Sequence, residues 1–200
     1  MTVLPLALVW QRTDTIGGEF VLLDDRDGLT AQGLSFTAAP VKYSVRYELA
    51  TDPAWVSTHL DLTTEGEGWR RSVRMDRTGG RWRVTTSESG NLNTAVPAAP
   101  LAGIEDPDRL AEAYDVAVYD SPLTCTLPIR RLNLLAQTPG TAHTILSAWV
   151  VLPSLAVLPV ENSYTVLDER SIRFTSATSR ADVTVDGSGF VTNYPGMATR

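Results

Sequence analysis

The chain has 200 residues, of which 43% are hydrophobic and 20% are charged, as expected for one soluble folded domain spanning residues 1–200. Its formal net charge of −6 argues against binding to nucleic acids or to anionic membranes, because both need a cationic surface. The single cysteine excludes an internal disulfide, and with only two distant histidines, His59 and His143, no metal site is expected.

The N-terminal stretch MTVLPLALVWQRTD contains an apolar run of roughly eight residues, whereas a transmembrane helix needs about 20. It has neither a cationic leader nor a small-residue cleavage site. We therefore interpret it as a first β-strand, with no transmembrane segment, and expect a cytoplasmic protein.

The N-terminal half shows the alternation of apolar and polar residues that is typical of half-buried strands. The pattern is clearest at the apolar positions Val41, Tyr43, Val45, Tyr47 and Leu49. Glycine-containing turn signals near residues 27–28 and 78–80 predict two hairpins.

Residues 88–113 interrupt this rhythm, because they are rich in Ala, Pro and Gly. They predict a surface excursion rather than further strands. Within them, Asp106 followed by Pro107 favours the start of a short helix.

The segment TCTLPIRRLNLL, residues 124–135, predicts a helix with Thr126 as its N-cap and Pro128 in its first turn. Its apolar side chains spread nearly all the way round a helical wheel, which is typical of a helix buried on every side. Arg130 shares the one polar sector with Asn133, whereas Arg131 falls within the apolar sector. The segment therefore predicts a helix enclosed by a sheet, with at least one arginine inside.

The C-terminal third returns to short strands separated by Pro, Asp or Gly-Ser-Gly. The predicted strands are residues 143–152, 162–167, 171–177, 180–186 and 189–194. Regular short strands with turn signals between them indicate a mainly β protein: a long antiparallel sheet, closed or strongly curled, around a single buried α-helix.

Four stretches, TLPIRRL, SAWVVLP-L, NSY and VDGSGFV-NYPGM, resemble the pattern of the bacterial family called "putative glycolipid-binding proteins", formerly a domain of unknown function. The N-terminal half agrees with the family more weakly. The structural signature comprises Leu127, Pro128, Ile129, Asp186, Tyr194, Pro195 and Gly196.

The resemblance implies a spiral β-roll, a long antiparallel sheet wrapped around one α-helix, often as a homodimer. A homodimer is also expected because a curled sheet leaves edge strands that need covering. The chain departs from the family pattern at Cys125, where Asn is usual, at Asn162, where Gln is usual, and in the length of residues 88–113.

Arg130 and Arg131 have two interpretations. A buried guanidinium must be paired, so the favoured one is ion pairs to carboxylates, with Glu19, Asp115 and Asp186 as candidates. The alternative is a clamp for a phosphate, sulfate or carboxylate head group. The pair can also divide these roles, with Arg131 structural and Arg130 facing a ligand.

Among the aromatic residues, Trp10, Trp149 and Tyr164 are candidates for the floor of a sugar or acyl site, although core packing is the favoured interpretation for the two tryptophans. Trp69 and Trp82 stand among arginines on a predicted hairpin, which favours a surface contact or a dimer interface. Cys125 is expected to be buried and unreactive.

No glycine-rich phosphate loop, serine elbow or metal-spaced carboxylates occur, so neither catalysis nor a cofactor is expected. The favoured hypothesis is a non-enzymatic protein that binds a lipid or glycolipid, with Arg130, Arg131, Trp149, Tyr164 and Trp10 as candidate ligand-binding residues. Two alternatives remain: an enzyme or ligand sensor acting on a small anionic or aromatic molecule inside the roll, and an interaction module without a small ligand.

Overall fold

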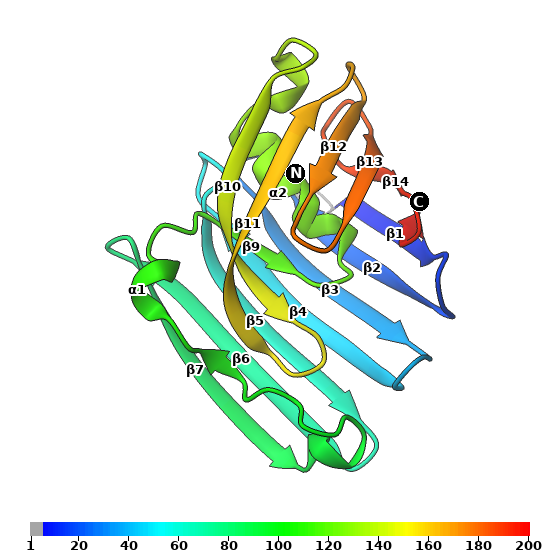
Figure 1. Cartoon of the computed structure of the whole chain (residues 1–200), viewed down its shortest axis with the longest axis vertical. Coiled ribbons are helices and arrows are strands. Elements are labelled where there is room, and N and C mark those ends of the chain that lie inside the picture. The colour runs from blue at the N-terminus through cyan, green and yellow to red at the C-terminus, as the bar shows by residue number, and fades with distance from the viewer. Residues whose placement is uncertain (1–5) are drawn as a thin grey trace, which may run out of the picture.

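The computed structural model describes residues 6–200 and is mainly β, as predicted (Figure 1). The N-terminal half supplies seven antiparallel strands: β1 (Leu6–Arg12), β2 (Gly17–Asp24), β3 (Thr30–Thr37), β4 (Tyr43–Thr51), β5 (Ser57–Gly66), β6 (Trp69–Thr78) and β7 (Arg81–Gly90). The strand expected at the N-terminus begins at Leu6, and the part of that prediction on residues 1–5 lies outside the described residues. The two predicted hairpins are confirmed, since β2 pairs with β3 and β6 with β7.

The C-terminal half continues the same sheet. Its strands are β9 (Asp115–Val118), β10 (Ala142–Val151), β11 (Ala156–Val166), β12 (Ser171–Thr175), β13 (Arg180–Val185), β14 (Val191–Tyr194) and β15 (Ala198–Thr199). The order along the sheet is β7-β6-β5-β4-β3-β2-β1-β15-β14-β13-β12-β11-β10-β9, so the first and last strands of the chain are neighbours. The sheet is antiparallel except where β9 pairs with β10 and where a short strand, β8 (Gly103–Ile104), pairs with β11, and it is curled but not closed.

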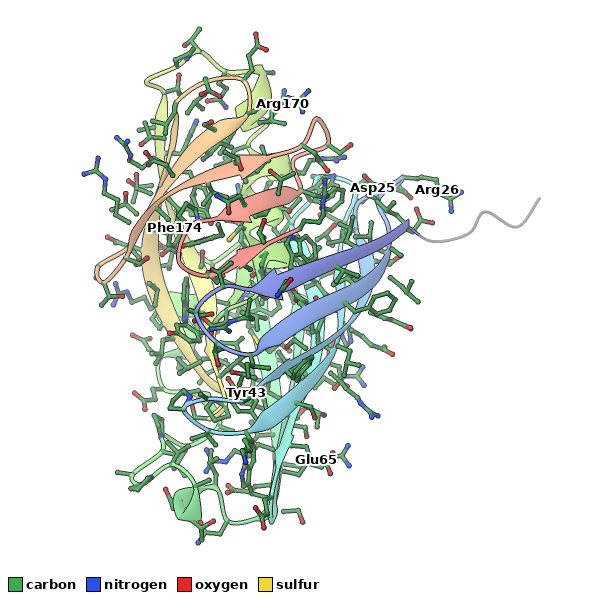
Figure 2. The ribbon with its side chains drawn as sticks, turned by 90° about the vertical axis from the view of Figure 1, so that its right-hand side faces the viewer. Asp25, Arg26, Tyr43, Glu65, Arg170 and Phe174 are labelled. Carbon is green, nitrogen blue, oxygen red and sulfur yellow. The ribbon has the colours of Figure 1, made fainter. Side chains whose placement is uncertain are left out.

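The helix α2 (Pro122–Arg131) lies between the two halves of the sheet, which face each other in the view of Figure 2. Its side chains Leu123 and Leu127 belong to a buried cluster with residues from both halves of the sheet, and Ile129 belongs to a second cluster among the C-terminal strands. Seven of its ten residues are buried, which confirms the enclosed helix expected from its all-round apolar pattern.

The predicted start of this helix was wrong. The N-cap is Ser121 rather than Thr126, because Pro122 supplies the proline that is favoured in a first turn. Pro128 therefore lies inside the helix. The helix ends at Arg131, since Asn133 adopts a left-handed conformation with φ of 51° and a 3₁₀ turn, η2 (Leu134–Ala136), follows it.

The excursion predicted at residues 88–113 begins after β7 and runs to β9. It contains a 3₁₀ turn, η1 (Leu92–Thr94), a short strand, β8 (Gly103–Ile104), that pairs with β11, and the predicted helix, α1 (Pro107–Leu110). The Asp106 carboxylate caps α1 by accepting a hydrogen bond from the Arg109 amide at 3.0 Å. Arg71, which is 1% exposed, fastens the excursion to the roll by donating to the Pro100 and Ser154 carbonyls.

Trp69 and Trp82 were expected at a surface or dimer contact, and this prediction was wrong. Both are buried, at 3% and 6% exposed. They occupy the inward positions of β6 and β7, where alternation turns the neighbouring arginines Arg70 and Arg81 outward. The Trp82 indole donates to the Ala113 carbonyl at 3.0 Å, which ties β7 to the end of the excursion.

Candidate functional site

A cavity of about 440 Å³ lies between the first turns of α2, β9 and the C-terminal strands. Its inner wall is aromatic and apolar, and hydroxyl and carboxylate groups stand among its other residues. The lining residues are Asp14, Ala117, Val118, Tyr119, Asp120, Ser121, Thr124, Cys125, Trp149, Tyr164, Phe174, Ser176, Thr178, Ser179, Tyr194, Pro195, Gly196 and Met197. We call this space the aromatic cavity. Its volume falls within the range of roughly 300–1,000 Å³ that is typical of small-molecule sites.

Five aromatic rings, projecting from different elements of the C-terminal half, form a continuous cluster along the aromatic cavity. Phe174 is at the centre, with ring centroids 5.4 Å from Tyr164, 6.2 Å from Tyr194 and 6.5 Å from Trp149. Tyr119 meets Trp149 edge to face at 6.4 Å. These separations are those of mutually stabilising aromatic pairs, so the wall is held in place before any ligand arrives.

Tyr164 is the polar group best placed for a ligand. The residue is only 4% exposed, and it lines the cavity. Burial raises the pKa of Tyr164 well above its ordinary value, so the hydroxyl keeps its proton. A phenolic hydroxyl in this position can donate a hydrogen bond to a polar group of a ligand or accept one from it.

Cys125 also lines the aromatic cavity and is half-buried rather than fully enclosed. Burial, and secondarily the nearby Glu19, raise the pKa of its thiol to about 12. The thiol is therefore protonated at neutral pH, and its predicted lack of reactivity stays a prediction.

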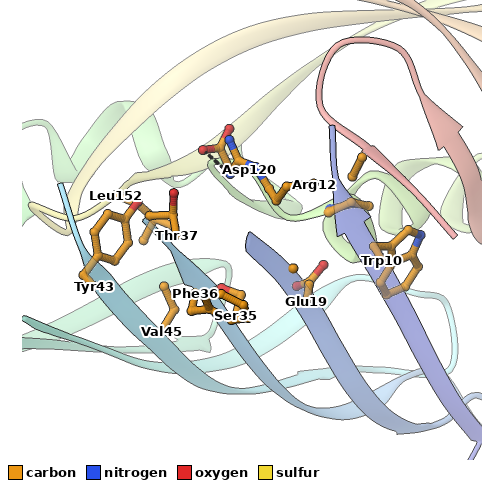
Figure 3. Close-up of a pocket in the computed structure, with 13 residues that line it drawn as sticks. Trp10, Arg12, Glu19, Ser35, Phe36, Thr37, Tyr43, Val45, Asp120 and Leu152 are labelled. Atoms are coloured by element: carbon orange, nitrogen blue, oxygen red, sulfur yellow. Dashed lines mark ion pairs between the residues drawn. The ribbon is translucent and has the colours of Figure 1, made fainter. Parts of the chain in front are cut away.

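Two carboxylates line the side of the cavity next to the β1–β2 turn, and they share one arginine. Arg12 bonds to Asp14 through Nε at 2.8 Å and to Asp120 through Nη1 at 2.6 Å. Arg12 itself lines the neighbouring pocket, and Figure 3 shows its ion pair with Asp120 there. The hydrogen bond from Arg12 lowers the pKa of Asp14, whereas burial raises the pKa of Asp120.

The first turn of α2 is occupied by an acidic side chain, Glu19 of β2. Glu19 is 4% exposed and lines the pocket of about 20 Å³ drawn in Figure 3. Its Oε1 accepts hydrogen bonds from the Ser121 hydroxyl at 2.7 Å and the Tyr47 hydroxyl at 2.6 Å, and Oε2 has no partner among the described residues. Burial raises the pKa of Glu19, opposed by both hydroxyls and the Leu123 amide.

Arg131 and Asp115 form the ion pair that was predicted. Asp115 is 1% exposed, and both its oxygens accept hydrogen bonds from Arg131, the shortest being 2.6 Å from Nη2. The two other candidate partners were wrong. Glu19 bonds to the hydroxyls described above, and Asp186 pairs with Arg200 at 2.8 Å.

Arg130 has a different set of contacts, at the opposite end of α2 from the aromatic cavity. Its guanidinium donates to the Ser188 carbonyl at 2.7 Å and lies 3.3 Å from Asp25. It also stacks over the Trp55 ring, 4.2 Å from the centroid. These contacts join the end of the helix to three loops.

Of the five candidate ligand-binding residues, the structure brings two to the aromatic cavity, Trp149 and Tyr164. Arg130 and Arg131 do not line it, and Trp10 is 1% exposed, donating its indole N–H to the Val191 carbonyl at 2.8 Å. The sequence interpretation missed Phe174 and Tyr119. Both occur as single aromatics in short apolar segments, and nothing in their local pattern distinguishes them from core residues.

No helix in residues 6–200 is long and apolar enough to cross a membrane. Likewise, this part of the chain contains no group of three or more His, Cys, Asp and Glu side chains placed to hold a metal ion.

Comparison with known proteins relates this geometry to a family. The sequence profile of the family described as "Putative glycolipid-binding" matches residues 7–200. The crystal structure of a DUF1089 family protein from Pseudomonas aeruginosa has a similar fold, with a TM-score of 0.71 at 24% sequence identity, covering 100% of both chains. No functionally curated protein matches the chain. Because the match covers nearly the whole sequence, the chain belongs to the "Putative glycolipid-binding" family.

Proposed function

We propose that the protein is a non-enzymatic binding protein whose ligand is an amphipathic lipid or glycolipid, held in the aromatic cavity. The observation that carries the proposal is the cavity of about 440 Å³ with a preformed aromatic wall, which includes the hydroxyl-bearing ring of Tyr164. The family's name points in the same direction. Aromatic faces suit both acyl chains and the C–H faces of sugars, and a hydroxyl suits a polar head group.

The chemistry of the lining residues supports binding rather than turnover. No histidine lines the aromatic cavity, and the pKa of about 12 for Cys125 leaves the thiol a poor nucleophile. The volume of about 440 Å³ suits a head group or part of an acyl chain, so the remainder of a two-chain lipid would extend outward. A cytoplasmic location belongs to the proposal, and fractionation of the native host tests it.

Native mass spectrometry of protein purified from its host tests the proposal directly, since a bound lipid appears as an added mass. Ala117→Phe places a phenyl ring in the aromatic cavity from β9, and it should abolish that added mass. Ala142→Phe is the matched control, because Ala142 is exposed on β10 and does not line the cavity. If both variants keep the ligand, it binds elsewhere and the assignment of the cavity is wrong.

We also propose that the protein is a homodimer, formed through the outer face of β1–β3. Exposed apolar side chains on that face stand opposite one another across the strands, Val9 opposite Phe20 and Phe20 opposite Leu34. Next to this apolar face, β4 carries one positively charged and one negatively charged residue, Arg46 and Glu48. A two-fold axis would place an arginine of one copy near a carboxylate of the other, so the surface is complementary to itself.

Size-exclusion chromatography with light scattering tests the dimer. The wild type should have twice the mass of one chain at micromolar concentration. Phe20→Lys, which places a charge in the centre of the apolar face, should return the mass of a single chain. Thr85→Lys adds the same charge at an exposed position on β7, remote from that face, and should leave the dimer intact.

A further inference from the structure

We propose that the head group bound in the aromatic cavity carries a positive charge, as an amine or a quaternary ammonium group. This inference rests on the proposed function and goes beyond it by assigning the chemical class of the ligand. Three features of the cavity support it: the sign of the charges that line it, its aromatic walls, and the side chain that occupies the first turn of α2.

All formal charge lining the aromatic cavity is negative. Among the described residues that line it, Asp14 and Asp120 are the only charged ones, and none of these eighteen is Lys, Arg or His. The two carboxylates share the single guanidinium of Arg12, so one negative charge is left without a counter-charge. A cation entering the cavity would balance that charge, whereas an anion would add to it.

The aromatic wall has the same preference. The face of an aromatic ring carries partial negative charge, and clusters of aromatic rings bind ammonium groups through cation–π attraction. Trp149 and Phe174 supply two such rings from β10 and β12, and Tyr119, in the turn after β9 and next to Asp120 in the chain, supplies a third. An alkylammonium group near Asp120 would therefore meet both a carboxylate and ring faces.

The first turn of α2 would ordinarily favour an anion, because a helix N-terminus is partially positive and presents unpaired N–H groups. In this protein, groups of the chain itself already occupy the N-terminus of α2. Pro122 has no N–H group, and the buried carboxyl group of Glu19 lies against Ser121 and the Leu123 amide. The N-terminus of α2, which would otherwise suit a phosphate or carboxylate of a ligand, is therefore occupied by the carboxyl group of Glu19.

Titration calorimetry with three eight-carbon probes below their micelle concentrations tests the inference: octyltrimethylammonium, octyl glucoside and octanoate. The ammonium probe should bind about tenfold more tightly than the glucoside, the size expected of a cation–π contact with one added carboxylate, and octanoate should bind most weakly. Asp14→Asn should remove most of this preference without weakening the glucoside. Asp27→Asn, which changes the net charge equally at an exposed residue outside the cavity, should not alter the preference.

The outcomes separate the two proposals. If the glucoside binds as tightly as the ammonium probe, or if Asp14→Asn leaves the preference intact, the charge assignment is overturned while a lipid-binding function stands. If none of the three probes binds and native mass spectrometry also finds no added mass, the proposed function fails and this inference fails with it. Added salt should reduce the affinity of octyltrimethylammonium relative to that of octyl glucoside, because it screens the attraction between the ammonium group and the carboxylates.

Discussion

Replacing Arg131 by methionine removes the only hydrogen-bond partner that the side chain of Asp115 has among the described residues. Both carboxylate oxygens of Asp115 bond to Arg131, and Asp115 is 1% exposed, so water cannot replace the guanidinium. Breaking a buried ion pair from one side costs about 3–5 kcal/mol. Because the side chain of Arg131 is 16% exposed, we expect the lower end, about 3 kcal/mol of the free energy of unfolding.

Urea denaturation of the wild type, Arg131→Met and the double variant Arg131→Met/Asp115→Asn measures this cost. The double variant should be more stable than Arg131→Met alone, because it no longer buries an unpaired charge. A loss below about 1 kcal/mol for Arg131→Met would refute the reasoning, since an unpaired buried carboxylate cannot cost so little.

The same comparison has a pH dependence of definite sign. Burial raises the pKa of Asp115 although Arg131 opposes it, so the folded state takes up a proton on Asp115 more readily than the unfolded state. Its contribution to stability is therefore greatest below the unfolded pKa and is lost as the pH rises through the folded pKa. Without Arg131 that folded pKa should rise further. The difference in stability between wild type and Arg131→Met should then be smaller at pH 5 than at pH 8.

Three further outcomes are expected. Arg130→Met should cost about 1 kcal/mol by urea denaturation, less than Arg131→Met, because it removes a cation–π contact and a half-exposed ion pair without stranding a buried charge. Cys125 should react slowly with a thiol reagent in native protein and fast in urea, since burial raises the pKa of its thiol; rapid native labelling would contradict this. Phe174→Leu should weaken octyltrimethylammonium more than octyl glucoside, and equal weakening of both would count against ring faces as the cation's partner.

The fold class could be predicted because alternation is a local property. At Val45, Tyr47 and Leu49 the apolar positions of β4 are all buried, as their spacing of two predicts. The alternation pattern does not predict β9, which has four residues and pairs in parallel with β10, a strand about 30 positions later in the chain. Short strands of this kind are specified by the sheet around them rather than by their own sequence.

The helix was predicted from its composition but misplaced along the chain. Two prolines, Pro122 and Pro128, can each stand in a first turn, and the local sequence does not distinguish between them. The local sequence was also insufficient for Trp69 and Trp82, which were expected at the surface because arginines are their neighbours in the chain. Neighbours along a strand point to the opposite face, so charged neighbours indicate an inward tryptophan as readily as an outward one.

The candidate site could be predicted only in part. The sequence indicates which aromatic residues are buried, but it does not indicate which of them border a cavity and which are packed on all sides. Tyr164 and Trp149 were candidates from the sequence, but the same reasoning gave equal standing to Trp10, which fills the core. Asp120 and Tyr119 lie in the turn between β9 and α2, and their approach to Asp14 brings together residues more than 100 positions apart. No spacing rule within one segment contains that information.

The two ends of α2 explain why an open space persists beside a buried helix. Arg130 and Arg131 fix its last turn to loops and to β9, and Glu19 holds its first turn against β2. These contacts hold the helix beside the aromatic cavity, which it lines with the small side chains of Thr124 and Cys125. The thiol of Cys125 is only a weak hydrogen-bond donor, so this part of the wall should favour an apolar part of the ligand.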